Sequence, residues 1–226
     1  MTPAIRILFA TVTVIVTVAV ASLEISPGPA LAAGGGEHMR RAAVELMVIR
    51  GDARRLRDPA ITKRHRKGLE DRVRGGLAGL AVLLRLADQE AGRAPIDAAK
   101  KVAELASAFA AANLEMFETR ALRLATRYPL RLSPILRPGP TRRRLADGRR
   151  LHEKLCAGCH DDPDTTPERP AYDLFAEARR LTWGEFVARL LVGVRGDIFT
   201  GIANPFSDEQ IAALADFYRS SGGTPD

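Results

Sequence analysis

The chain has few aromatic residues and almost no cysteine. Only 5% of its 226 residues are aromatic, and there are two cysteines. Two cysteines cannot supply a disulfide framework for a chain of this length. The scarcity of aromatic residues, beside abundant alanine, leucine and arginine, favours helices over sheets. Hydrophobic residues make up 46% and charged residues 27% of the chain, which excludes wholesale disorder and a polytopic membrane protein.

Only one long apolar run occurs, and it lies near the N-terminus. Residues 7–23 are almost uninterruptedly apolar and follow Arg6. A Pro-Gly pair at residues 27–28 breaks any helix, and Ala-Leu-Ala at residues 30–32 is the small-x-small pattern that a signal peptidase reads. We therefore predict a signal peptide over residues 1–32 and export to the periplasm or another compartment outside the cytoplasm. The alternative is a membrane anchor formed by residues 7–23.

A proline-rich stretch separates two parts of different charge. Residues 129–141 hold four prolines, which neither a helix nor a central strand accepts, so we predict a semi-rigid linker there. It divides the mature chain into a basic domain at residues 33–128 and a second domain at residues 142–226. Residues 33–141 carry 21 Lys and Arg against 12 Asp and Glu, a net of +9, whereas residues 142–226 carry 12 against 14, a net of −2.

The charge of the basic domain predicts a partner rather than a reaction. An exported chain seldom meets nucleic acid, so we interpret the basic run at residues 63–67 as a solvated helix start or a patch for an acidic partner. Anionic lipid headgroups are a second target for such a surface, which would make the protein a peripheral membrane protein. We find no catalytic constellation in residues 33–128.

Residues 33–128 show the apolar periodicity of three helices. The predicted stripes are Met39, Ala43, Leu46 and Ile49 in the first helix; Leu69, Val73, Leu77, Leu80, Leu84 and Ala87 in the second; and Val102, Leu105, Phe109, Ala112, Met116 and Leu124 in the third. Short connections between long helices imply an antiparallel bundle. His38 and His65 lie among charged residues, where we expect exposed side chains.

The strongest motif lies in the second domain, at residues 156–160. Cys156, Cys159 and His160 form a Cys-x-x-Cys-His sequence, which is the attachment site for a c-type haem. Two thiols about one helical turn apart can add to the two vinyl groups of one haem, and the adjacent imidazole can then bind the iron. The alternatives are a redox-active cysteine pair and half of a zinc site. We predict one covalent haem c, with His160 as the proximal iron ligand.

The sequence around this motif resembles a class I cytochrome c over residues 145–226. Residues 145–155 resemble the first helix of that family, residues 183–196 its middle helix, and residues 207–218 its last helix. The resemblance implies that the first and last helices cross, with Gly148 beside Phe217. His152 stands where the family usually has an aromatic residue, which implies helix packing rather than ligation. From the residues themselves, Thr182 and Ser207 are expected helix N-caps.

The chain departs from the family on the far side of the iron. The family's usual distal ligand is a methionine just before the last helix, but the four methionines here are Met1, Met39, Met47 and Met116, all before the haem motif. The resemblance places Phe199 and Ile202 where some members have methionines, so these residues are predicted to wall the distal side. A shorter alignment makes Asn204 a weak distal ligand. Lys154, a His or Met lent by the basic domain, and no protein ligand at all stay open.

The fold class we predict is therefore all-α, with an N-terminal helical bundle of unrecognised family followed by a class I cytochrome c domain. The resemblance implies electron transfer through one covalent haem, and the net charge of +9 on residues 33–141 predicts a redox partner with an acidic docking surface. The alternative is a haem protein that binds or reacts with a small ligand, such as nitric oxide, carbon monoxide or peroxide, at an open sixth iron site. We expect an electron carrier or a subunit of a redox complex more than an enzyme.

Overall fold

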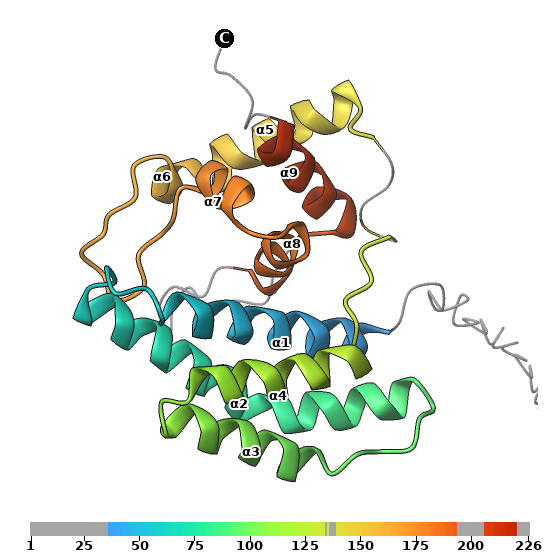
Figure 1. The fold of residues 1–226 in the computed structure, drawn as a ribbon. Helices are drawn as coiled ribbons and strands as arrows, with labels where there is room; N and C mark the ends of the chain where they lie inside the picture. The colour runs from blue at the N-terminus through green and yellow to red at the C-terminus, as the bar shows by residue number, and fades with distance from the viewer. Residues whose placement is uncertain (1–35, 134, 136–138, 194–205, 221–226) are drawn as a thin grey trace, which may run out of the picture. The chain divides into compact units, whose positions relative to one another are not determined.

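The computed structural model describes residues 36–133, 135, 139–193 and 206–220, and their secondary structure is helical without a strand (Figure 1). The helices are α1 (Glu37–Arg55), α2 (Lys63–Glu90), α3 (Ala98–Ala110), α4 (Leu114–Arg127), α5 (Arg142–Leu155), α6 (Ala157–His160), α7 (Leu174–Arg180), α8 (Trp183–Val192) and α9 (Asp208–Ser220). The predicted all-α class is confirmed for the described residues. The predicted signal peptide lies outside them.

Short polar side chains set the beginnings of most of these helices. The capping residues that accept a hydrogen bond from a backbone N–H of the first turn are Thr62, Asp97, Asn113, Thr141, Asp173 and Thr182. Ser207 and Gln210 form a reciprocal capping box before α9, since each side chain bonds the backbone N–H of the other residue. The predicted caps at Thr182 and Ser207 are confirmed.

The prediction of three helices in residues 33–128 was wrong, because there are four. The third predicted helix is broken after Ala110, and α4 begins at Leu114. Ala112 adopts a left-handed backbone conformation with a φ of 53°, and the Asn113 side chain caps the new helix. The break changes which residues face inward, so Met116, predicted to be buried, is 43% exposed.

Helices α1 to α4 share one apolar core, and α1 contacts both α2 and α4 (Figure 1). Its buried members are Ala42, Leu46, Ile49, Ala53, Leu56, Leu69, Val73, Leu77, Leu80, Leu84, Ala87, Ala98, Val102, Leu105, Ala108, Phe109, Phe117, Ala121, Leu124 and Tyr128. Most of the predicted stripes are among them. Burying stripes of this kind is the main source of stability for helices that are marginal in isolation.

Helix α1 also contacts α8, so the N-terminal helices α1 to α4 pack on the C-terminal helices α5 to α9. Val44 and Val48 of α1 form a small buried cluster with Ala188 of α8. Ile135 of the proline-rich stretch is buried against α8 and α9. The described residues belong to one compact unit. Among the residues that the structure covers, no helix is both long and apolar enough to cross a membrane.

Candidate haem-binding site

The two cysteines lie on one tight helical turn, with Cys156 between α5 and α6 and Cys159 within α6. The carbonyl oxygen of Cys156 accepts hydrogen bonds from the backbone N–H groups of Cys159, at 3.1 Å, and His160, at 3.0 Å. Residues three apart on such a turn share one face. Cys156 is half-buried and Cys159 is exposed, and the two form no disulfide. Both sulfur atoms are therefore available, about one turn apart, for one flat ligand.

His160 is held in a single tautomer by the backbone of Tyr172. Its Nδ1 lies 2.5 Å from the carbonyl oxygen of Tyr172. A carbonyl oxygen only accepts hydrogen bonds, so Nδ1 must carry the proton in this contact. The Nε2 of a neutral ring then keeps its lone pair, which is the arrangement that metal-binding histidines use.

An apolar surface continues from Cys156 into the C-terminal helices. Phe186, Leu214, Phe217 and Tyr218 form its buried part. Partly exposed apolar side chains cover this part, namely Leu151, Cys156, Leu174, Phe175, Ala178, Leu181, Trp183, Leu190 and Phe206. A porphyrin is a large apolar plane, and half-exposed side chains of this kind gain by covering it. Two thiols, a directed imidazole and an apolar wall together fit a covalently bound haem.

Helices α5 and α9 cross at Gly148. A Cβ atom placed on Gly148 would lie 2.2 Å from the carbonyl oxygen of Ala213 and 2.7 Å from the Cβ of Phe217. Both distances are below any normal contact, so only glycine allows the two helices to approach this closely. The predicted contact between Gly148 and Phe217 is confirmed. The crossing places the end of α5, and therefore Cys156, against the aromatic side chains of α9.

His152 packs in this crossing, as predicted. It is buried, with its Nδ1 2.9 Å from the hydroxyl of Tyr218 and its Nε2 3.0 Å from Oδ1 of Asp161. Its ring centroid lies 5.2 Å from that of Phe175 and 5.6 Å from that of Phe217. Since both ring nitrogens have protein partners, His152 fills the space between the helices and does not point a lone pair at a ligand.

The environment of Cys156 differs from that of a reactive redox cysteine. Burial raises the pKa of the Cys156 thiol, and the hydrogen bond with the Tyr218 hydroxyl opposes this only in part. Burial likewise raises the pKa of Tyr218. Redox-active cysteine pairs depend on a lowered pKa of the attacking thiol, because the thiolate is the nucleophile. The buried environment of Cys156 therefore argues against this thiol as the attacking group of a disulfide exchange.

Several candidates for the distal side of the iron fall outside the described residues. These are Phe199, Ile202 and Asn204, and their predicted roles stay predictions. Lys154 is exposed near the end of α5. Within the described ranges, no group of three or more His, Cys, Asp and Glu side chains is arranged to hold a metal ion.

Among the N-terminal methionines, Met47 is the one that meets the C-terminal helices. Its Sδ and Cε lie 3.6 Å from the position of a Cβ on Gly184 of α8. Met39 instead lies beside Arg93, whose Nη2 is 3.2 Å from its sulfur. Met116 is largely exposed on α4. Of the three, Met47 is therefore best placed to serve the C-terminal half.

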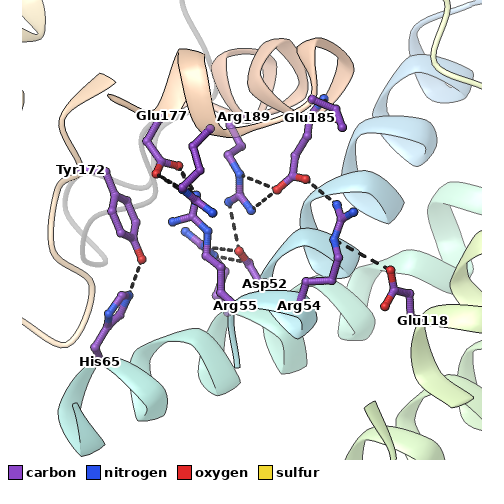
Figure 2. Close-up of polar contacts among 12 residues, drawn as sticks. Asp52, Arg54, Arg55, His65, Glu118, Tyr172, Glu177, Glu185 and Arg189 are labelled. Atoms are coloured by element: carbon purple, nitrogen blue, oxygen red, sulfur yellow. Dashed lines mark hydrogen bonds and ion pairs between the residues drawn. The ribbon is translucent and has the colours of Figure 1, made fainter. Parts of the chain in front are cut away.

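Sequence reasoning missed a buried ionic network between α1 and α8 (Figure 2). Asp52 of α1 is fully buried and pairs with both Arg72 of α2 and Arg189 of α8. Glu185, one turn before Arg189, pairs with Arg54 at 2.5 Å and with Arg189 at 2.8 Å. The available signal was Asp52 itself, because it lies three residues after Ile49 and so falls on the buried side of α1.

Tyr172 was also missed, although it touches His160. Its hydroxyl is hydrogen-bonded to Nε2 of His65, and its ring lies 4.2 Å from the guanidinium carbon of Arg55 (Figure 2). His65 was expected to be exposed, but it is half-buried in this contact. No local pattern marks Tyr172, because its partners are 107 residues away at His65 and 12 residues away at His160.

Comparison with known proteins gives no relative for this arrangement: no protein-family model matches the chain, and no curated protein or solved structure matches it significantly.

Proposed function

We propose that this protein is an exported c-type cytochrome that carries one covalent haem and transfers electrons to or from a partner protein. The observation that carries the proposal is the joint geometry of the haem motif. Cys156 and Cys159 lie one turn apart, and the Nδ1–H of His160 is held by the carbonyl of Tyr172 at 2.5 Å, which leaves Nε2 for a metal. The class I cytochrome c arrangement of α5, α8 and α9 is part of the same proposal.

Each group of residues has a separate task in this proposal. Cys156 and Cys159 hold the haem through thioether bonds, and His160 supplies the proximal nitrogen. The half-exposed apolar side chains around Phe186 and Phe217 shield the ring from water. Once bound, haem supplies an iron that cycles between Fe(III) and Fe(II) at a potential that ligands, burial and hydrogen bonds adjust. This haem is the one cofactor that we propose.

Acid–acetone extraction of the purified protein tests the covalent haem. Since the chain has one Cys-x-x-Cys-His motif, we expect one haem per chain, and its colour should stay with the protein pellet. Colour that moves entirely into the acetone would contradict thioether attachment. A colourless protein purified from a host with a functioning haem-attachment system would contradict the whole proposal.

The second candidate function is binding of a small ligand such as nitric oxide, carbon monoxide or peroxide at an open sixth iron position. The observation that favours it is the position of the methionines, all of which precede the haem motif. Visible spectra of the reduced protein with and without carbon monoxide separate the two functions. A rapid spectral change supports an open site, and an unchanged spectrum supports a six-coordinate electron carrier.

The partner we propose is a redox protein with an acidic docking surface, consistent with the +9 charge of residues 33–141. Part of that charge is used internally, since Arg55, Arg72 and Arg93 pair with Glu177, Asp52 and Asp88. Exposed basic side chains such as Lys63 and Arg123 are better placed to meet a partner. Peripheral association with anionic lipids is a further part of this proposal.

A further inference from the structure

We propose that His65 of α2 is a positioning residue for His160 and acts through Tyr172. The inference rests on the proposed haem function, because a proximal ligand is what makes the orientation of His160 matter. It goes beyond that function in giving the N-terminal helices a defined task at the site. That task is to hold the carbonyl group that fixes the imidazole of His160.

The loop that carries Tyr172 has little structure of its own. Residues 161–173 contain no helix or strand. From residue 162 to residue 172, no backbone group makes a hydrogen bond to another backbone group of the described chain. A carbonyl in such a loop points at His160 only if other contacts hold it there. The orientation of Tyr172 is therefore set by the contacts of its side chain together with Asp173, the next residue, which caps α7.

Two side chains from the N-terminal helices hold Tyr172. The Nε2 of His65 is hydrogen-bonded to its hydroxyl, and the two ring centroids are 5.5 Å apart. The guanidinium group of Arg55 lies over the tyrosine ring, 4.2 Å from its centroid, and also pairs with Glu177. Figure 2 shows His65 and Arg55 reaching Tyr172 from separate helices. The ring is thus fixed at its tip and on its face.

The rest of the loop lies against the same helix, α2. The Nη1 of Arg64 donates to the carbonyl of Thr166 at 2.9 Å, and Lys67 pairs with Glu168 at 3.1 Å. A Cβ on Gly68 would lie only 2.1 Å from the carbonyl oxygen of Glu168, so this close approach requires glycine. These contacts bring the loop to α2, and among these α2 side chains it is His65 that contacts Tyr172.

The expected consequence at His160 follows from the chemistry of imidazole. A hydrogen bond from Nδ1–H to a carbonyl fixes the orientation of the ring and makes Nε2 a stronger base. A more basic proximal ligand favours Fe(III) and lowers the reduction potential. When Tyr172 is released, this hydrogen bond weakens, so the Nδ1 proton should exchange faster and the potential should rise.

The test compares His65→Ala, Tyr172→Phe and the double variant in the full-length protein. Both single changes remove the same side-chain hydrogen bond, and neither removes the backbone carbonyl group of residue 172 from the chain. We expect exchange of the His160 Nδ1 proton with solvent, measured by NMR, to become about tenfold faster in each. The reduction potential should rise in both, and the double variant should shift no further than the larger single effect. If the shift in the double variant equals the sum of the two single shifts, His65 does not act through Tyr172 and the inference is wrong.

Lys67→Met is the matched control, since it removes a contact between the same helix and the same loop without touching Tyr172. It should keep the wild-type exchange rate and potential. A wild-type exchange rate in His65→Ala overturns the inference, whether or not haem is attached. If the wild-type chain carries no covalent haem but the exchange rates change as expected, the positioning role stands and the proposed function fails. The two failures are therefore distinguishable.

Discussion

Asp52 of α1 and Arg189 of α8 form an ion pair in which Oδ1 of Asp52 lies 3.0 Å from Nη1 of Arg189. Asp52 has no exposed surface, and Arg72 pairs with the same carboxylate. Removing one member of a buried ion pair leaves its partners charged, unpaired and still shielded from water. The N-terminal and C-terminal helices are thus joined by a contact that tolerates little change.

Asp52→Asn should lower the free energy of unfolding by about 3–5 kcal/mol, because Arg72 loses its carboxylate partner and Arg189 keeps only Glu185. Denaturant unfolding followed by circular dichroism measures this. Glu168→Gln is the control, since Glu168 and Lys67 form an exposed pair 3.1 Å apart across the same two parts of the chain. That change should cost less than about 1 kcal/mol. Equal losses in the two variants would contradict a special role for the buried pair.

Gly148→Ala should destabilise the protein, because its Cβ would lie 2.2 Å from the Ala213 carbonyl oxygen. Overpacking against a helix backbone typically costs about 1–3 kcal/mol. Gly79→Ala on α2 provides a control of opposite sign, since no atom lies within 4 Å of its added Cβ. Within a helix, this second change should stabilise by about 0.5–1 kcal/mol. Thermal unfolding of both variants checks whether the first loses and the second gains stability.

The stability of the protein should fall as the pH drops below about 6.5, in part because of His65. Burial lowers the pKa of His65, and the neighbouring charges of Arg55 and Arg72 lower it further, against a smaller opposing effect of Asp52. In that pH window the unfolded chain binds a proton at His65 that the folded chain does not, so unfolding is favoured. The loss is complete once the pH is below the folded-state pKa.

His65→Gln should remove this part of the pH dependence. The measurement is the free energy of unfolding of wild type and variant at about pH 7.5 and about pH 5.5. The difference in the free energy of unfolding between wild type and variant should be smaller at the lower pH. There, protonation of His65 stabilises the unfolded wild-type chain, and the variant has no such group. A difference independent of pH would show that His65 does not titrate between the folded and unfolded states as expected.

Local signals predicted where two of the C-terminal helices begin, whereas a helix crossing was implied by the resemblance. Thr182 and Ser207 predicted helix starts, because their side chains can cap a first turn. The contact between Gly148 and Phe217 was implied by the resemblance to class I cytochromes c. The break at Ala112 was missed because the apolar period continues across it from Phe109 to Met116, although Asn113 was an available capping signal.

Contacts between distant residues could not be predicted in the same way. Asp52 and Arg189 are 137 residues apart, and His65 and Tyr172 are 107 apart. Nothing in the period or composition of either segment selects the partner, because charge pairing depends on how whole helices pack. The haem motif was predicted residue by residue, but the carbonyl that holds His160 comes from a loop without a motif. The sequence therefore indicated the candidate residues of the site, whose haem chemistry stays a prediction, but not the contacts that hold His160.

Cys156→Ala and Cys159→Ala should each lower the yield of haem-loaded protein, because one thioether bond is lost in each. The double variant should release all of its haem into acid–acetone. Gly158→Ala is the matched control on the same turn, since no atom lies within 4 Å of the added Cβ. Haem content relative to protein, measured by absorbance, checks the series. Full haem retention in the double variant would exclude attachment through these thiols.

The oxidised protein should lack the weak red-region band of methionine bound to Fe(III), because the resemblance places Phe199 where the distal methionine is expected. A phenyl ring has no lone pair for iron. Loss of a thioether ligand, which favours Fe(II), should also give a reduction potential below that of His/Met relatives. Near-infrared absorption and potentiometry measure these two properties independently of each other.

Phe199→Met tests the alignment directly, since a methionine placed at the family's position should create a low-spin, methionine-ligated spectrum. Ile202→Met is the companion variant at the second aligned position. If the wild-type spectrum already shows a bound methionine, it must come from the N-terminal helices. Met47 is then the first to replace, because its sulfur lies 3.6 Å from the Cβ position of Gly184 on α8. Loss of the methionine band in Met47→Leu, and its survival in Met116→Leu, would assign the ligand to α1 and discard Phe199 as the distal wall.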